Sequence, residues 1–278
     1  MKKFFLIVII ITACNQQKPV APAIMLDSPQ EFIQEEFQAI LDSAKVRGTI
    51  LILDEVENKF YSNDFDWARA GQLPASTFKI PNSIIALESG VVENDSTILV
   101  WDGEPRRMSS WEEDMTLKQA FLRSCLPCYR KIAREVGLER MKALANKLDY
   151  GNLKFDSTNL DLFWVEGESR ITPFEQIDFL IRLANSELPI SERTEELVKK
   201  IMILEEGENY TLRAKTGWSI VNNQNNGWFV GYLTYEDRKY FFATNVEPGK
   251  DFHMDDFARI RGKVTMKALK VLGVKTSS

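Results

Sequence analysis

Ser76 and Lys79 form the only Ser-x-x-Lys sequence in the chain, and they fall where a helix is predicted to begin. Residues three apart on a helix share one face, so the hydroxyl and the amine can meet. A serine hydroxyl is a weak nucleophile until a base takes its proton, and an ordinary lysine, with a pKa of about 10.4, is protonated near neutrality. Lys79 can therefore act as a base only if burial lowers its pKa or if its amine is chemically changed.

Three further motifs follow along the chain. Ser124-Cys125-Leu126 lies early in a helical segment, and Tyr150-Gly151-Asn152 follows a helix. Lys215-Thr216-Gly217 lies in a predicted strand, with Trp218 next. Each motif is common when it stands alone, and a helix-start serine is usually a cap. Their order and combination favour a shared catalytic site.

Residue periodicity places these motifs in an α+β fold. Helical spacing predicts helices over residues 29–44, 76–90, 115–148 and 260–271. Runs of β-branched and aromatic residues predict strands over residues 48–54, 59–62, 210–220, 228–235 and 240–246. We expect an antiparallel sheet formed from both chain ends and flanked by helices, with an inserted all-helical subdomain over approximately residues 80–165.

Composition restricts the function classes. The chain has 278 residues, of which 44% are hydrophobic, so it can build a real core. With 35 basic and 40 acidic residues the formal charge is −5, which lacks the basic footprint of a nucleic-acid binder. We expect no nucleic-acid partner. His253 is the single histidine, which excludes a His-rich zinc site, and we assign it no role and expect no metal.

The motifs and their surroundings resemble the class D β-lactamases, or oxacillinases, of the penicillin-recognising serine enzymes. The resemblance runs from about residue 30 to the C-terminus. The segments that carry it are Pro74 to Asn82, Trp111 with Asp114 and Thr116-Leu117, Leu148 to Asn152, Phe163 to Gly167, Lys215 to Trp218 and Gly227 to Gly231. It implies a β-lactamase/transpeptidase-like fold and hydrolysis of the β-lactam ring of penicillin-type antibiotics, which confers resistance.

The resemblance also implies catalytic roles. Ser76 forms an acyl-enzyme, and Lys79 reacts with CO2 to give an N-carboxylated lysine that is the general base for acylation and deacylation. CO2 or bicarbonate is thus expected, and no dissociable cofactor. Trp164 donates its indole N–H to this carboxylate, unless it is simply a core aromatic. Ser124 relays a proton to the leaving lactam nitrogen, with Lys215 beside it.

The resemblance places substrate-binding groups as well. The backbone N–H groups of Ser76 and Trp218 stabilise the developing oxyanion. Thr216 and Gly217, next to the strand lysine, lie near the substrate carboxylate. Arg261 resembles the C-terminal arginine that binds this carboxylate in bidentate fashion. Arg259, two residues away, and a solvated helix arginine are the alternatives.

One motif departs from the family. Its second motif is usually Ser-x-Val, and Leu126 occupies the valine position, which packs over the lysine. We hypothesise that Leu126 tunes deacylation, through water access to the acyl-enzyme or through CO2 retention. The loops around Trp111, Met115 and residues 219–227 are expected to shape the substrate spectrum.

The N-terminus is predicted to direct export. Lys2 and Lys3 precede the apolar run Phe4 to Ile11, which is far shorter than the roughly 20 residues of a membrane-spanning helix. We expect a signal peptide over residues 1–13 and a flexible tether over residues 14–27, before a catalytic domain over residues 28–278. Residues 11–14 resemble a lipobox. This implies a periplasmic protein, lipid-anchored at Cys14 to a bacterial membrane, with cleavage without lipid as the alternative.

Cys125 and Cys128 belong to the same exported chain, and an oxidising compartment permits a disulfide between them. A thioredoxin-like redox pair is expected at a helix start after a strand within a βαβ pattern, whereas this segment is mostly helical. That disfavours redox catalysis. A structural disulfide and two buried thiols both stay open, as do a monomer and a homodimer.

Other functions share parts of this pattern. The ligand-binding domains of penicillin sensors resemble class D enzymes and form an acyl-enzyme that hardly hydrolyses, but they are normally tethered to a multi-span membrane protease. A transpeptidase or carboxypeptidase would hold the acyl group for an amine acceptor, and the Trp164 match and the compact length argue against it. A non-catalytic lipoprotein would form no acyl adduct.

Overall fold

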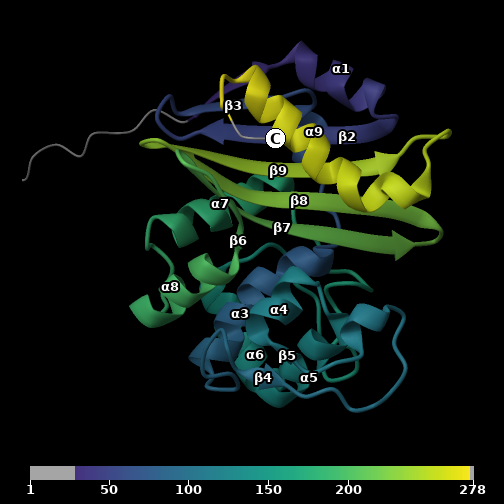
Figure 1. The fold of residues 1–278 in the computed structure, drawn as a ribbon, viewed down its shortest axis with the longest axis vertical. Coiled ribbons are helices and arrows are strands. Elements are labelled where there is room, and N and C mark those ends of the chain that lie inside the picture. The colour runs from purple at the N-terminus through teal and green to yellow at the C-terminus, as the bar shows by residue number, and fades with distance from the viewer. Residues whose placement is uncertain (1–28, 276–278) are drawn as a thin grey trace, which may run out of the picture.

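The computed structural model describes residues 29–275, and within them a seven-stranded sheet has the order β1-β3-β2-β9-β8-β7-β6 (Figure 1). The strands are β1 (Gln30–Ile33), β2 (Val46–Asp54), β3 (Lys59–Ser62), β4 (Ile98–Leu99), β5 (Met115–Thr116), β6 (Ile203–Glu206), β7 (Tyr210–Val221), β8 (Gln224–Tyr235) and β9 (Arg238–Pro248). The helices are α1 (Glu35–Ser43), α2 (Phe65–Ala68), α3 (Lys79–Glu88), α4 (Leu117–Leu122), α5 (Leu126–Val136), α6 (Leu138–Leu148), α7 (Pro173–Ala184), α8 (Glu192–Ile201) and α9 (Phe257–Val271). Short 3-10 turns are η1 (Ala75–Phe78), η2 (Ser109–Trp111) and η3 (Met254–Asp256).

The expected signal peptide, the tether and Cys14 lie outside the described residues. In the part of the chain that the structure describes, no helix combines the length and the apolar character needed to cross a bilayer.

Strands from the two ends of the chain meet in the middle of the sheet, as expected. β2 pairs antiparallel with β9, with Val46 opposite Pro248 and Asp54 opposite Tyr240. β9 is also the last strand of the antiparallel β7–β8–β9 meander. Consecutive residues of β2 enter opposite cores, Ile50 on one face and Leu51 on the other, because side chains alternate along a strand. This explains the uninterrupted apolar run in a central strand.

Helices cover both faces of the sheet (Figure 1). On one face α1 and α9 contribute Phe37, Leu41, Val264 and Leu269 to a core that includes Ile50. On the other face α7 packs with the helical region in a larger core. Each fully buried side chain of this size contributes roughly 1.5–3 kcal/mol. The sheet is therefore held between two apolar layers, and Phe78 of η1 belongs to the layer on the α7 side.

The helical region follows the N-terminal hairpin and occupies the lower half of Figure 1. It contains α3, α4, α5 and α6, together with the small antiparallel β4–β5 ladder in which Ile98 faces Thr116. Thr116 also begins α4 through a reciprocal cap with Gln119. The α+β fold class is confirmed, with a two-stranded ladder among the helices of the insert.

The first expected helix is wrong at its start. The spacing predicts a helix over residues 29–44, whereas Gln30–Ile33 form β1, which pairs in parallel with β3, and the helix begins at Glu35. Phe32 and Ile33 are exposed, so they do not share the buried face of Phe37. The physical reason is tertiary contact. The edge of β3 pairs with the backbone N–H and C=O groups of this segment, and the periodicity of side chains does not reveal that partner.

Candidate active site

Ser76 lies in the single turn η1, which leads directly into α3. The preceding residue, Ala75, has a φ of 50°, a left-handed conformation that is costly for a residue with a side chain. Its backbone N–H donates to the carbonyl oxygen of Trp164 at 2.6 Å, which holds this conformation. Backbone strain of this kind occurs at functional sites where the surroundings fix it.

A buried hydrogen-bonded triangle supports the turn. The Thr77 hydroxyl lies 2.9 Å from the Tyr150 hydroxyl and accepts from Gln176 Nε2 at 2.9 Å. Tyr150 donates in turn to Gln176 Oε1 at 3.1 Å. Burial raises the pKa of Tyr150, which keeps its proton on the hydroxyl. The Tyr150-Gly151-Asn152 motif thus positions the residue next to Ser76.

Lys79 is fully buried, and its Nζ donates to Ser76 Oγ at 3.1 Å. The ammonium position lies 4.9 Å from the centre of the Tyr129 ring. Burial lowers the pKa of Lys79 to about 7, and no carboxylate within residues 29–275 offsets that effect. A large fraction of the amine is therefore neutral near pH 7, as a basic or CO2-reactive lysine requires.

Lys215 and Ser124 form a second serine–lysine pair. Lys215 Nζ donates to Ser124 Oγ and, at 3.1 Å, to the carbonyl oxygen of Thr216. Burial, followed by the positive charges of Lys79 and Arg261, holds the pKa of Lys215 well below its ordinary value. Because Lys79 affects this pKa, the two pairs lie within electrostatic reach of each other. The structure thus brings together the four residues that the short motifs indicate.

Trp164 carries an unsatisfied donor in the core. Its side chain is fully buried and stacks on Phe78 with ring centres 5.4 Å apart. Its indole Nε1 has no hydrogen-bond partner among the described residues. Most buried donors are paired, so an orphan donor at a functional site indicates a missing acceptor.

Strand β7 passes close to the turn that carries Ser76, because β7 has a glycine at that point. A Cβ on Gly217 would lie 3.1 Å from the Pro74 carbonyl oxygen and 3.2 Å from Thr77 Cγ2. Opposite Gly217 on β8, Trp228 donates its indole N–H to the Leu73 carbonyl oxygen at 2.8 Å. These contacts fix the Lys-Thr-Gly strand against the turn that carries Ser76.

The outer edge of β7 offers the expected oxyanion donor. The Ala214 N–H donates across this edge to the Met202 carbonyl oxygen, where β6 begins. Backbone N–H groups of alternate residues in an antiparallel strand point to the same side. The N–H of Trp218 therefore points to this edge, past the segment that β6 covers.

Arg261, not Arg259, reaches β7. Arg261 is 4% exposed, and its guanidinium donates to the carbonyl oxygen of Gly217. Burial lowers its pKa to about 10, so it keeps its charge at neutral pH. A Cβ on Gly227 would lie 2.6 Å from Arg261 Cδ, so only glycine at position 227 avoids a clash with the Arg261 side chain. Arg259 is exposed and pairs with Asp256 at 2.7 Å.

The chain matches the family model of the penicillin binding protein transpeptidase domain over residues 47–270. It is 38% identical to the β-lactamase OXA-48 of Klebsiella pneumoniae, over 81% of this chain and 83% of the relative, and 38% identical to OXA-10 of Pseudomonas aeruginosa, over 89% and 90%. The solved class D β-lactamase YbXI from Nostoc is 44% identical, with a TM-score of 0.82, and covers 86% of this chain and 99% of its own. The chain belongs to the class D β-lactamase family. The expected resemblance and enzyme class are confirmed.

The remaining predicted residues of this class D β-lactamase lie as follows. Trp111 donates its indole N–H to the Arg123 carbonyl oxygen at 3.0 Å. Met115 is 1% exposed and belongs to the main core. Leu126 is the first residue of α5 and is half-buried against that core. Their effects on substrate and on deacylation stay predictions.

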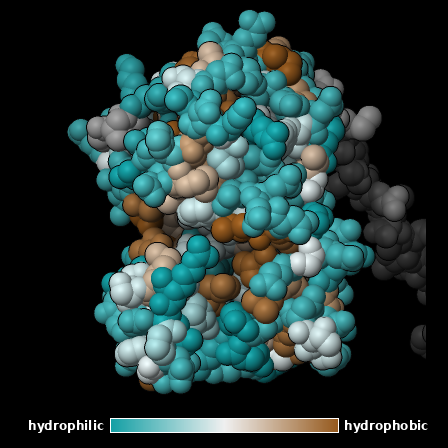
Figure 2. All heavy atoms as spheres, turned by 90° about the vertical axis from the view of Figure 1, so that its right-hand side faces the viewer, coloured by the Kyte–Doolittle hydropathy of each residue, from teal (hydrophilic) through white to brown (hydrophobic). Residues whose placement is uncertain are grey.

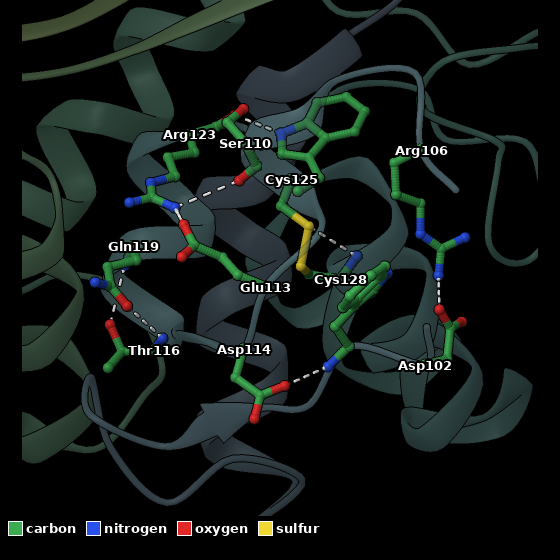
Figure 3. The surroundings of a disulfide bond; sticks show 12 residues. Asp102, Arg106, Ser110, Glu113, Asp114, Thr116, Gln119, Arg123, Cys125 and Cys128 are labelled. Atoms are coloured by element: carbon green, nitrogen blue, oxygen red, sulfur yellow. Dashed lines mark hydrogen bonds and ion pairs between the residues drawn. A yellow bond between two sulfur atoms is a disulfide. The ribbon is translucent and has the colours of Figure 1, made fainter. Parts of the chain in front are cut away.

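Cys125 and Cys128 form a disulfide at the start of α5 (Figure 3). Cys125 is fully buried and caps the helix, since its Sγ accepts from the Cys128 N–H at 3.2 Å. Of the two alternatives left open by the sequence, the structure shows the disulfide.

The surface of this class D β-lactamase is hollowed between the sheet and the helical region. Figure 2 shows this hollow from the side towards which β7 runs, with apolar side chains along its edges. Ile220 and Val221, at the end of β7, are exposed large apolar residues.

Sequence reasoning missed several residues that this site uses. Tyr129 supplies the ring beside Lys79, and Gln176 completes the triangle under η1. Asn82 lies one turn after Lys79, fully buried, with neither side-chain polar atom paired among the described residues. Asn82 was detectable, because an asparagine three residues after Lys79 on a helix shares its face. Tyr129 and Gln176 have no signal that separates them from ordinary core and helix positions.

Proposed function

We propose that this class D β-lactamase hydrolyses the β-lactam ring of penicillin-type antibiotics through an acyl-enzyme on Ser76, and so confers resistance. One observation carries the proposal: Ser76 Oγ is paired with the buried amine of Lys79, whose pKa is about 7. A hydroxyl held 3.1 Å from a neutralisable base has the geometry of an activated nucleophile. The two curated relatives described above are both named β-lactamases, which supports the choice of substrate class.

Lys79 fits N-carboxylation by CO2. Attack on CO2 requires the neutral amine and releases one proton, and burial supplies that neutral form near pH 7. A buried carboxylate also needs donors. Trp164 Nε1 is a buried donor without a partner among the described residues. When CO2 is bound, the carboxylate supplies a general base for the Ser76 hydroxyl and for the water that cleaves the acyl-enzyme.

The second pair and the strand complete the reaction. Ser124, held by Lys215, passes a proton to the lactam nitrogen as its bond to the carbonyl carbon breaks. A neutral Lys215, favoured by burial, can exchange that proton with Ser124. The N–H groups of Ser76 and Trp218 stabilise the oxyanion, and loss of one such donor typically costs about 3 kcal/mol in the transition state.

Substrate binding uses positive charge near the strand. Arg261 remains charged at neutral pH and lies against Gly217, next to Thr216. A carboxylate on the substrate can pair with this guanidinium and accept from the Thr216 hydroxyl.

The test combines kinetics with intact mass. The purified protein is mixed with a chromogenic cephalosporin and with benzylpenicillin, with and without bicarbonate, while adducts are recorded. We expect sustained turnover that rises with bicarbonate and a transient adduct that Ser76→Ala abolishes. A persistent stoichiometric adduct without turnover would assign a sensor or a wall enzyme instead, and no adduct at all would refute the serine mechanism.

We also propose that the chain is exported to the periplasm and lipid-anchored through Cys14. The basic and apolar residues before Cys14 support this, and so does the Cys125–Cys128 disulfide, because disulfides persist in oxidising compartments. Mass spectrometry of the N-terminal peptide from cells tests it. An acylated Cys14 is expected, and an unmodified N-terminus starting at Met1 would contradict export. Whether the enzyme is a monomer or a homodimer stays a prediction.

A further inference from the structure

Ser124 has a backbone conformation that serine rarely adopts. It follows the last turn of α4 with a φ of 53°. The Cys125 N–H donates to the Ala120 carbonyl oxygen at 2.9 Å, and the Ser124 N–H donates to that of Phe121 at 3.1 Å. This hydrogen-bond pattern ends many helices, and the left-handed position is usually glycine. Here the position carries a hydroxyl, and Lys215 donates to that hydroxyl.

The disulfide begins one residue later. Cys125 is the cap of α5, and Cys128 lies in the first turn of the same helix. Ser124 and Cys125 alone connect the capping residue of α4, Arg123, to the first residue of α5. Because Cys125 is bonded to α5 through its side chain and to Ser124 through the backbone, the disulfide restricts the direction in which the Ser124 side chain points.

The chain before Ser124 is held by a different set of contacts. Figure 3 shows Arg123 beside the disulfide, with its guanidinium directed to Glu113 and to the backbone oxygen of Ser110. The Arg123 carbonyl oxygen accepts from Trp111 Nε1 at 3.0 Å. Hydrogen bonds thus anchor the upstream side of Ser124, and a covalent bond anchors the downstream side.

We propose that the Cys125–Cys128 disulfide is a positioning element for catalysis, which holds the Ser124 hydroxyl against Lys215 so that protons pass to the leaving nitrogen during acylation. This rests on the proposed function. The disulfide touches no reacting atom and takes no part in electron transfer. It acts by fixing a residue whose conformation is unfavourable in the free chain.

The disulfide can be opened chemically. A dithiol reductant gives two electrons and two protons, the S–S bond breaks, two cysteine thiols form, and the reductant becomes a cyclic disulfide. Cys125 is fully buried, whereas Cys128 is partly exposed and lines a surface cavity of about 420 Å3 with Trp111 and Lys131. The reductant can therefore approach the Cys128 sulfur from that cavity.

The experiment compares the oxidised enzyme with the Cys125→Ala/Cys128→Ala double variant in saturating bicarbonate. Pre-steady-state mixing with benzylpenicillin gives the acylation rate, and decay of the adduct gives the deacylation rate. Displacing a reacting group by about 1 Å can cost about 100-fold in rate, so we expect acylation to slow by about 10- to 100-fold. Deacylation of the adduct that does form should change much less. Reduction of the folded wild-type enzyme by dithiothreitol should reproduce the effect.

Two comparisons separate positioning from general stabilisation. In a Ser124→Ala background, loss of the disulfide should slow acylation no further, because the positioned hydroxyl is already gone. Ser191→Ala removes the side-chain cap of α8 and should lower the melting temperature with little effect on acylation. Circular dichroism confirms that each protein is folded.

Equal acylation rates with and without the disulfide would overturn the proposal, as would an equal further loss in the Ser124→Ala background. If the double variant does not fold, the dithiothreitol arm decides. If wild-type enzyme forms no adduct on Ser76, the proposed function fails first, and that outcome is visible in the oxidised control.

Discussion

The backbone carbonyl oxygen of Trp164 accepts the N–H of Ala75, the residue before Ser76, at 2.6 Å. The same tryptophan leaves its indole N–H unpaired within residues 29–275. One residue therefore fixes the strained turn through its backbone and offers a free donor through its side chain. Trp164 therefore holds the turn that carries Ser76 and places an unpaired donor in the core, where its ring stacks on Phe78, the residue before Lys79.

Trp164→Phe should separate these two roles, because it removes the indole donor and leaves the backbone carbonyl in place. In bicarbonate-free buffer we expect the melting temperature to change little, since relief of the unpaired buried donor, which costs about 1–3 kcal/mol, offsets the cavity that the smaller ring leaves. With bicarbonate, turnover should fall by about 10- to 100-fold, the equivalent of a lost hydrogen bond to a charged group. Trp228→Phe is the matched control. Its indole is paired with Leu73, so its loss should destabilise the protein in both buffers. A bicarbonate response unchanged by Trp164→Phe would contradict this role.

Lys79 should make the folded chain more stable as pH rises above neutrality. Its pKa is about 7 in the fold, against about 10.4 in an unfolded chain. Between these values the unfolded chain binds the proton and the folded chain does not, so the free energy of unfolding increases with pH. Below pH 7 the folded chain also binds the proton, and the full penalty of the buried charge applies.

Urea unfolding at pH 7 and pH 9, without bicarbonate, measures this effect. Lys79→Met should show a smaller rise in the unfolding midpoint between the two pH values than the wild type. Some rise should remain, because the pKa of Lys215 is lowered by burial in the same direction. Identical slopes for variant and wild type would show that Lys79 does not titrate with a lowered pKa.

Arg261→Ala should weaken substrate binding more than turnover. Loss of a charged hydrogen-bonding partner typically costs about 1.5–3 kcal/mol, so KM for benzylpenicillin should rise by about 10- to 100-fold. Arg259→Ala should leave KM near the wild-type value, because that side chain is exposed and pairs with Asp256. Steady-state kinetics of both variants decide between the two arginines, and the reverse pattern would assign the role to Arg259.

Leu126→Val tests the departure in the second motif. Valine has one methylene fewer, so we expect several-fold faster deacylation if Leu126 restricts water, at a cost of about 1 kcal/mol in stability. Adduct decay by intact mass and bicarbonate titration of turnover measure the two effects. If neither differs from wild type, Leu126 has no influence on this step.

Local signals predicted the meander, the hairpin, the helices of the insert and the first contacts of the site, but they gave no prediction for α7 and α8. The β-branched runs gave the meander and the hairpin, and the helical spacing of Ser76 and Lys79 gave their contact at 3.1 Å. The predicted helix is wrong at Gln30–Ile33, because pairing with β3 makes these four residues a strand at the edge of the sheet, and their own sequence does not show that partner.

Other parts of the site depend on the assembled fold. Thr77 and Gln176 are 99 residues apart in sequence, and nothing in either segment indicates their hydrogen bond. Arg259 and Arg261 lie on different faces of α9, and only the packing of that helix over Gly227 shows which one reaches β7. The burial of Lys79, which sets its pKa, likewise follows from packing and not from the motif.

The pairing of β2 with β9 joins segments about 200 residues apart in the chain. β2 is synthesised early, and its edge that pairs with β9 stays unpaired until nearly the whole polypeptide is complete. Closure over such a distance is slow compared with hairpin or helix formation. A chain cut before residue 238 would keep that edge unpaired, and unpaired apolar strands recruit other chains. C-terminal truncation should therefore give aggregates and not a smaller soluble enzyme.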